Sequence, residues 1–257
     1  MITSHAARVR RHGRRQQDPD HGRFPTVYNQ LRKMRARAHV FLLSPAYCGG
    51  RRAGMLLRPG AASDLAVSLR SGSLTLGDAF TFLSGLYFRG KLTYARAFAR
   101  SASEGSPGTM IITPTRGLMA PEAPVSADLL REFAGVDVAA DDERYRLPLE
   151  RDLARLSAEL PAGSRVVLLG SIASDKYVSV LIRALGDRLH YPPSFIGRGD
   201  MSRGGLLLRS ARASTELEYQ RLESDTVRRG RRPPKLAPLA PSPAIVRRRS
   251  LRLERVL

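Results

Sequence analysis

Three short apolar runs in this sequence are each followed by residues that could bind or attack a small molecule. They span residues 39–43, 109–113 and 165–169. Behind them come a cysteine with two glycines and two arginines, a threonine–arginine corner, and a loop with serines and a tyrosine. Guanidinium and hydroxyl groups bind phosphate oxygens, and a thiolate is a nucleophile. These residue types indicate recognition of an anionic ligand, with or without a reaction.

The residues expected to bind this ligand lie directly behind the three runs. Gly49 and Gly50 allow positive backbone torsions, so their amides are expected to form an anion-binding nest beside the two arginines that follow. The full set from these loops is Gly49, Gly50, Arg51, Arg52, Thr113, Thr115, Arg116, Gly117, Ser171 and Tyr177.

A second group comes from residues 85–99. Tyr87, Lys91 and Tyr94 are spaced by four and three residues, so they share one face if the segment is helical. Aromatic rings beside a cation could stack a base and hold a phosphate, and Arg89 could assist. The alternative is that Tyr87, Tyr94 and Phe98 form an ordinary core stripe, which the spacing alone favours.

A glycine-rich segment, residues 195–205, supplies the candidate carboxylate. Its four glycines predict a shaped loop, and it matches neither a Walker loop nor a dinucleotide fingerprint. Arg198, Ser202 and Arg203 are expected to bind ligand there. Asp200 is the candidate catalytic residue, orienting water or stabilising an oxocarbenium-like sugar.

Cys48 is the second candidate catalytic residue. Neighbouring arginines would lower the pKa of its thiol, although no base stands near it in the sequence. The alternative is a small packed side chain, the more common role of a lone cysteine after a strand.

The elements that must position these residues indicate an α/β domain. Short apolar runs bounded by glycine or proline are typical of buried parallel strands, and parallel strands carry ligand sites at their carboxyl ends. Helices are expected at residues 61–71, 127–134, 148–160 and 176–185, and an edge strand at residues 216–219. We expect a three-layer α/β sandwich with a mostly parallel central sheet and disordered basic tails.

The charge of the chain lies mainly in its ends. The formal net charge is +20, but residues 1–37 contribute ten Arg or Lys against two Asp, and residues 228–257 ten against one Glu. We therefore expect a basic N-terminal extension (1–37), an α/β domain (38–227) and a basic Pro/Arg-rich tail (228–257), with both tails disordered. Arginine-rich arms can also bind nucleic acid through its phosphates.

Several classes of function are disfavoured by composition. No run approaches the ~20 apolar residues of a membrane span, so no membrane partner is expected. The single cysteine excludes an internal disulfide and suits a reducing compartment, the cytoplasm. No spacing of histidine, cysteine or carboxylates predicts a metal site, and no cofactor is expected. Nothing in the pattern fixes an oligomeric state.

Four blocks resemble the bacterial YaaA-like proteins and their uncharacterised relatives. The blocks are residues 42–52, with Cys48; residues 86–96, with a tyrosine-led helix; residues 112–121, with a Gly-Leu pair and a proline; and residues 168–178. This resemblance implies a uracil-DNA-glycosylase-like fold and a link to nucleobases, modified purines or DNA. The segment 197–205 has no counterpart in it.

Together these observations predict a pocket for a nucleotide, modified base or nucleic acid, with N-glycosidic-bond chemistry as its candidate reaction. The alternative is a non-catalytic DNA- or RNA-binding protein that acts through its arginine-rich tails. A metal enzyme ranks third.

Overall fold

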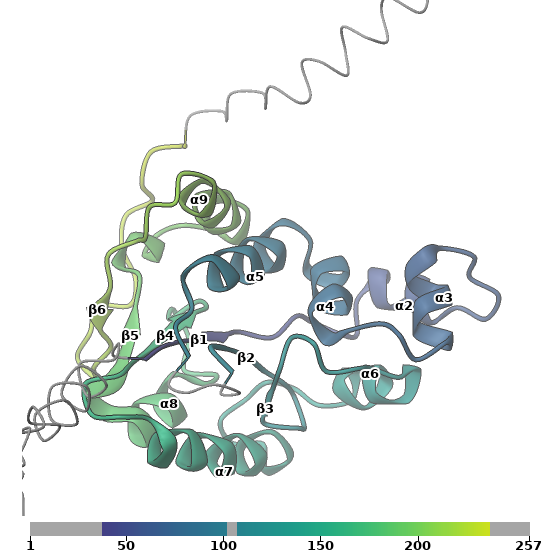
Figure 1. Ribbon diagram of the computed structural model, residues 1–257, viewed down its shortest axis with the longest axis horizontal. Coiled ribbons are helices and arrows are strands. Elements are labelled where there is room, and N and C mark those ends of the chain that lie inside the picture. The colour runs from purple at the N-terminus through teal and green to yellow at the C-terminus, as the bar shows by residue number, and fades with distance from the viewer. Residues whose placement is uncertain (1–37, 102–106, 237–257) are drawn as a thin grey trace, which may run out of the picture. The chain divides into compact units, whose positions relative to one another are not determined.

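The computed structural model describes residues 38–101 and 107–236 (Figure 1). The predicted N-terminal extension and residues 237–257 of the predicted tail lie outside the described residues. The structural statements below concern the described part of the chain.

A six-stranded mixed sheet forms the centre of the domain, in the order β3-β2-β1-β4-β5-β6. Strands β1 (His39–Leu43), β2 (Thr109–Ile112), β4 (Arg165–Leu169) and β5 (Leu189–Tyr191) run parallel. The two edge strands, β3 (Leu118–Met119) and β6 (Gln220–Arg221), are antiparallel to their neighbours. The three predicted strands are thus confirmed and lie side by side. The sheet was predicted to be mostly parallel; it is mixed, with four parallel strands between two antiparallel edge strands.

The apolar runs form strands because both of their faces are buried. Phe41 and Leu43 of β1 pack into the core on one face of the sheet, whereas Val40 and Leu42 pack into the core on the other. Side chains of a strand alternate between faces, so a strand covered on both sides is apolar throughout.

Helices cover both faces of the sheet. On one side lie α4 (Leu76–Ser84), α5 (Leu86–Phe98), α6 (Ala127–Ala134) and α9 (Asp200–Arg212), and on the other α7 (Glu143–Glu159) and α8 (Val178–Leu185) (Figure 1). Two shorter helices, α2 (Arg51–Leu57) and α3 (Asp64–Arg70), follow the end of β1. The described chain is an α/β fold with helices on both faces of its sheet.

The predicted helices are largely confirmed, with shifted starts. Ser63 caps α3, because its side chain accepts a hydrogen bond from Ala66 N. Helix α7 begins five residues before Pro148 and is capped by Asp142, so Pro148 lies inside it rather than at its start. Helix α8 begins at Val178, and neither Ser174 nor Asp175 caps it.

The glycine-rich segment was predicted to be a loop, and this is wrong for most of it, since α9 begins at Asp200. Its glycines permit close helix packing instead. A Cβ on Gly204 would lie 2.7 Å from Leu86 O, and one on Gly90 would lie 2.7 Å from Gly204 O. Side chains at these positions would therefore separate α5 from α9.

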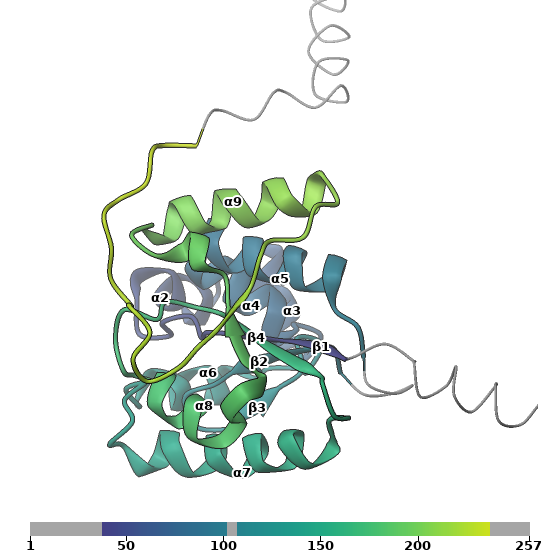
Figure 2. The same ribbon diagram turned by 90° about the vertical axis from the view of Figure 1, so that its left-hand side faces the viewer.

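The end of the described chain packs on the domain. Residues 216–219 are not a strand; the edge strand β6 follows them. Beyond it, Arg228 Nη1 donates to Asp175 Oδ1 at 2.6 Å, and Arg198 Nη1 donates to Pro234 O at 3.4 Å. Figure 2 shows the yellow end of the described chain rising beside α9. Residues 228–236, predicted to be part of a disordered tail, are therefore in contact with the domain.

Candidate functional site

A pocket of about 600 Å³ opens at the carboxyl ends of β1 and β4. Its size is that of a small-molecule site. Its wall is formed mainly by the loops after β1 and β4. Further residues come from the end of α4, the start of α5, the end of α6 with the turn behind it, Pro114 after β2, and Asp200 at the start of α9. Segments far apart in the sequence thus converge on one cavity, as predicted.

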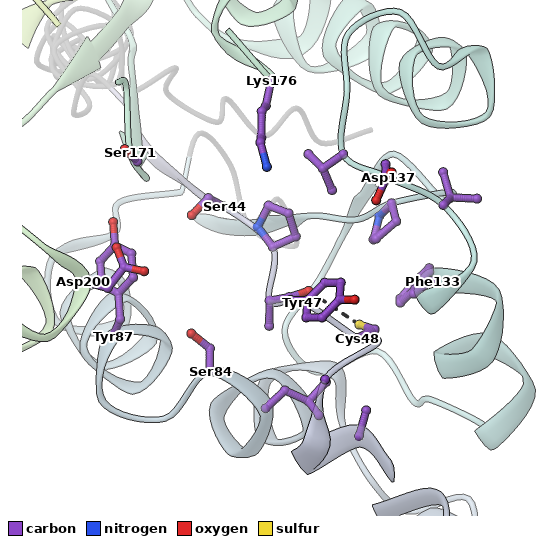
Figure 3. A pocket seen from close by; sticks show the side chains of 18 of the residues that line it. Ser44, Tyr47, Cys48, Ser84, Tyr87, Phe133, Asp137, Ser171, Lys176 and Asp200 are labelled. Atoms are coloured by element: carbon purple, nitrogen blue, oxygen red, sulfur yellow. Dashed lines mark hydrogen bonds between the residues drawn. The ribbon is translucent and has the colours of Figure 1, made fainter. Parts of the chain in front are cut away.

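Figure 3 shows how the side chains lie in the pocket. Tyr87 and Asp200 stand together on one side, and Phe133 lies on the other, with Ser44 and Tyr47 between them. Lys176 and Asp137, from the loops before α8 and after α6, also line the cavity. The pocket thus combines aromatic rings with charges of both signs.

The predicted site residues divide into two sets. Those that line the pocket are Cys48, Gly50, Arg51, Arg52, Tyr87, Ser171, Tyr177 and Asp200. Those that do not line it are Gly49, Arg89, Lys91, Tyr94, Thr113, Thr115, Arg116, Gly117, Arg198, Ser202 and Arg203.

The two glycines after β1 do not form the predicted nest, because neither has a positive φ. A Cβ on Gly49 would lie 2.7 Å from the hydroxyl of Tyr47, and one on Gly50 would lie 3.3 Å from its ring. The glycines thus let the Tyr47 ring lie against the loop, where it stays 74% exposed at the pocket.

The two arginines after the glycines begin α2. Arg52 Nη1 donates to Phe82 O at 3.1 Å, so this guanidinium also ties the loop after β1 to α4. Arg51 is exposed at the pocket. With Lys176 they are the three cationic residues of the lining.

Cys48 is a buried, packed residue. Burial raises the pKa of its thiol to about 12, and the thiol donates weakly to Ala46 O at 3.5 Å. The expected lowering of this pKa by the arginines is wrong, because the sulfur is enclosed and its burial raises the pKa instead. A thiol with so high a pKa is not an activated nucleophile.

The threonine–arginine corner is a structural turn. Thr113 bonds Gly117 O through both its amide and its hydroxyl, and Gly117 has a positive φ of 63°. Arg116 forms a bidentate ion pair with Glu132 of α6, which raises the pKa of Arg116 and lowers that of Glu132. Thr115 also donates to Glu132. These groups bind one another, and only Pro114 reaches the pocket.

Tyr94 belongs to the core, as the alternative interpretation held. Its hydroxyl accepts a hydrogen bond from Leu217 N at 2.7 Å and lies 2.5 Å from the hydroxyl of Tyr219. Arg89, on the same helix, is exposed and away from the pocket.

At the start of α9, only Asp200 reaches the pocket. Its Oδ1 lies 3.3 Å from Nη1 of Arg203, whose Nε donates to Phe195 O at 3.2 Å. Arg198 is held by Ser194 O and Ser202 Oγ. The arginines predicted to bind ligand thus hold the turn before α9 in place.

Tyr87 places a buried hydroxyl in the pocket wall. This oxygen makes no hydrogen bond of good geometry with the described residues; burial raises the pKa of the phenol, and the nearby Arg203 opposes this shift. A buried hydroxyl without a partner is costly, and a ligand in the cavity would supply one.

Lys91 is buried directly behind the pocket wall. Its Nζ donates to Ser44 O at 2.5 Å and to Ser44 Oγ at 2.9 Å, and lies 4.6 Å from the ring centroids of Tyr87 and Phe88. Burial lowers the pKa of Lys91 to about 7; nearby Asp200 opposes this shift and Arg203 adds to it. The helical face predicted for Tyr87, Lys91 and Tyr94 is confirmed, but it is buried.

The lining residues with polar or aromatic side chains that sequence reasoning missed are Ser44, Tyr47, Ser84, Phe133, Asp137, Ser174 and Lys176. Ser44, Tyr47 and Lys176 lie in the loops that were already predicted to form the site. Their position after a parallel strand would have been sufficient to predict them. Phe133 and Asp137 come from α6 and the turn behind it, and no local pattern marks them.

Among the described residues, no group of three potential ligands could hold a metal ion, and no helix has the length and apolar character needed to cross a membrane. Comparisons with models of protein families, with curated proteins and with solved structures found no match. The resemblance to the YaaA-like family therefore stays a prediction.

Proposed function

We propose that the protein binds a nucleotide, or another nucleobase-containing anion, in the pocket at the carboxyl ends of β1 and β4. The observation that carries this proposal is the exposed ring of Tyr47 in the same cavity as the cationic side chains of Arg51 and Lys176. An aromatic ring can stack on any base, and arginine or lysine can hold phosphate.

The remaining lining groups suit the polar edge of a base. The unpartnered hydroxyl of Tyr87 and the hydroxyls of Ser171 and Ser174 offer donors and acceptors, and the carboxylates of Asp137 and Asp200 accept from amino groups. A few polar groups in a partly apolar cavity fix the orientation of such a ligand.

Calorimetric titration of the full chain with nucleoside 5′-monophosphates, the matching nucleosides and short oligonucleotides tests this proposal. We expect a monophosphate to bind at least about tenfold more tightly than its nucleoside, because only the former engages the cations. Tyr47→Ala should lose about 1–3 kcal/mol of binding free energy.

Arg89→Gln is the matched control for Arg51→Gln, because Arg89 is also exposed but lies away from the pocket. Only Arg51→Gln should weaken binding of the monophosphate. Equal losses in both variants, or no binding by the wild type, would contradict the proposal.

The reaction that we propose for this ligand is hydrolysis of the bond between base and sugar. Asp200 supports it, since its largely exposed carboxylate lines the pocket and could orient water or stabilise the sugar cation. Chromatography should detect free base after incubation with nucleosides and nucleotides, and Asp200→Asn should reduce its release at least about 100-fold. Binding without release would limit the function to binding.

The second candidate function is nucleic-acid binding through the arginine-rich tails, which the charge of residues 1–37 and 228–257 favours. It predicts that the protein binds any oligonucleotide, that this affinity falls steeply with salt concentration, and that the affinity is unchanged in Tyr47→Ala. Pocket binding predicts a strong effect of Tyr47→Ala instead.

A further inference from the structure

A hydroxyl in the wall of the pocket contacts a buried amine behind that wall, in the arrangement that activates a serine nucleophile. Ser44 lines the cavity at the end of β1, and its Oγ is 2.9 Å from Nζ of Lys91 behind it. The amine is enclosed, since Lys91 is only 1% exposed, whereas Ser44 is reached from the cavity.

The geometry points to Ser44 and Lys91 as a serine–lysine dyad that hydrolyses a carboxylic ester bound in the pocket. This activity goes beyond the proposed nucleotide binding, and its chemistry does not require the ligand to be a nucleotide. Lysine serves as the base for a serine nucleophile in known variants of the catalytic triad.

The surroundings of Lys91 favour its neutral form, which a base requires. Among the described residues no carboxylate forms an ion pair with it; its neighbours are Ser44 and the faces of Tyr87 and Phe88. The nearest charged influences are Asp200 and Arg203 of α9, which act in opposite directions. A buried amine without a carboxylate partner loses its proton readily, consistent with a pKa of about 7.

Other elements hold Ser44 in place. A Cβ on Gly170, at the end of β4, would lie 2.9 Å from both Ser44 Cβ and the hydroxyl of Tyr177. The absence of that Cβ lets the loops after β1 and β4 meet. Ser44 is thus enclosed by Lys91, by Gly170 and by Tyr177, whose hydroxyl donates to Ser171 O at 2.7 Å. A nucleophile held from three sides is positioned before substrate arrives.

The reaction balances with water as the only co-substrate. Neutral Lys91 takes the proton of Ser44 as Oγ bonds to the ester carbonyl carbon. The carbon–oxygen bond to the leaving alcohol then breaks, and Lys91 returns the proton to that alcohol. Water, deprotonated by Lys91, next attacks the carbonyl carbon of acyl-Ser44. The bond between that carbon and Oγ breaks, Lys91 returns the proton to Oγ, and the carboxylic acid leaves.

The test is covalent labelling of the full chain with a fluorophosphonate, a reagent that traps activated serines, followed by peptide mass spectrometry. We expect one adduct, on Ser44, and hydrolysis of a short-chain p-nitrophenyl ester. Both should fall at least about 100-fold in Ser44→Ala and in Lys91→Met. Ser84→Ala is the matched control, because Ser84 lines the same pocket but is not bonded to Lys91.

The pH dependence of labelling keeps the proposal testable even if Lys91→Met does not fold. In the wild type the labelling rate should rise to a plateau with a midpoint near pH 7, where Lys91 loses its proton. A rate independent of pH, a midpoint above pH 9, or no adduct on Ser44 would overturn the dyad. Nucleotide titration of the wild type separates the two proposals, since nucleotide binding by a wild type that the fluorophosphonate does not label would refute the dyad alone.

Discussion

Strand β1 carries a buried polar cluster at each end, and the two clusters differ in what completes them. At the amino end, which we name the closed end, His39, Tyr94, Glu216 and Tyr219 contact one another. At the carboxyl end, the open end, Ser44, Tyr87, Lys91 and Tyr177 adjoin a cavity.

The closed end has a structural explanation within the chain. Tyr94 binds the backbone of Leu217, and His39 Nδ1 lies 3.0 Å from Glu216 Oε1, so this cluster holds the segment before β6 against β1. Within the part of the chain that the structure describes, the open end holds an amine without a carboxylate partner and a Tyr87 hydroxyl without a hydrogen bond of good geometry. Among the described residues, Nε2 of His39 and Oε1 of Glu216 at the closed end also lack a hydrogen bond, so the difference is that the Tyr87 hydroxyl at the open end lines a cavity that a ligand can enter.

The largest expected effect comes from forcing α9 away from the open end. Gly204→Val places side-chain atoms against the backbone of Leu86 and Tyr87, so we expect a loss of about 3 kcal/mol in the free energy of unfolding. It should also displace Asp200 and weaken ligand binding. Denaturant unfolding measures the first effect and calorimetry the second.

Gly54→Ala in α2 is the control, because a Cβ there meets nothing within 4 Å. It should be neutral or stabilise by up to about 1 kcal/mol. If Gly204→Val were equally harmless, the close contact of α5 and α9 would not be what positions the pocket wall.

The two clusters should titrate in separate pH windows. Burial, with Arg100, Arg165 and His190, lowers the pKa of His39 to about 4, and burial lowers that of Lys91 to about 7. In each case the unfolded chain takes up a proton at a pH where the folded chain does not, so stability falls on acidification. The loss should run from about pH 10.5 to 7 for Lys91 and from about pH 6.5 to 4 for His39.

Thermal unfolding of the wild type, His39→Gln and Lys91→Met across pH measures these windows. His39→Gln should abolish only the loss of stability between about pH 6.5 and 4, which is at most about 3 kcal/mol. Lys91→Met should abolish only the loss of stability between about pH 10.5 and 7. A Lys91→Met variant with the same alkaline slope as the wild type would mean that Lys91 stays protonated, which would remove the base from the proposed dyad.

A pair of tyrosine variants compares the closed end with the open end, because each variant removes a single hydroxyl group. Tyr94→Phe removes a hydroxyl that accepts from Leu217 N, so about 1–3 kcal/mol of stability should be lost. Tyr87→Phe removes a hydroxyl that makes no hydrogen bond of good geometry with the described residues, and it should change stability by less than about 0.5 kcal/mol while weakening ligand binding. The reverse order in denaturant unfolding would contradict the distinction between the two ends.

The smallest effect should come from Arg116, which was predicted from the sequence to bind the ligand and which pairs with Glu132 in the structure. Arg116→Gln breaks an exposed pair with Glu132, worth about 1 kcal/mol or less, and should leave nucleotide affinity unchanged. A tenfold loss of affinity would mean that Arg116 exchanges Glu132 for the ligand.

The sheet could be predicted because its strands are encoded locally. The runs that form β1, β2 and β4 are apolar on both faces, and a position behind a parallel strand placed Ser171, Tyr177 and the loop of Cys48 at one edge. What could not be predicted depends on partners distant in the sequence. The pairing of Arg116 with Glu132 and the contact of Gly90 with Gly204 have no local signal.

The same reason explains the incorrect interpretation of residues 197–205. Glycine indicates a turn when a positive φ is required, and Gly197 does have a φ of 71°. Gly204, by contrast, is helical and needed only for the approach of α5. Sequence shows that a glycine is present, but not which of these two requirements it meets.

The contact between residues 228–236 and the loop after β4 has a practical consequence for anyone expressing this protein. Arg228 and Arg229 bind Asp175 and the carbonyl of Ala173, immediately beside Lys176. A gene cut at the compositional boundary of residue 227 would discard these anchors and alter the cavity's rim. An affinity tag joined after residue 236 would preserve them.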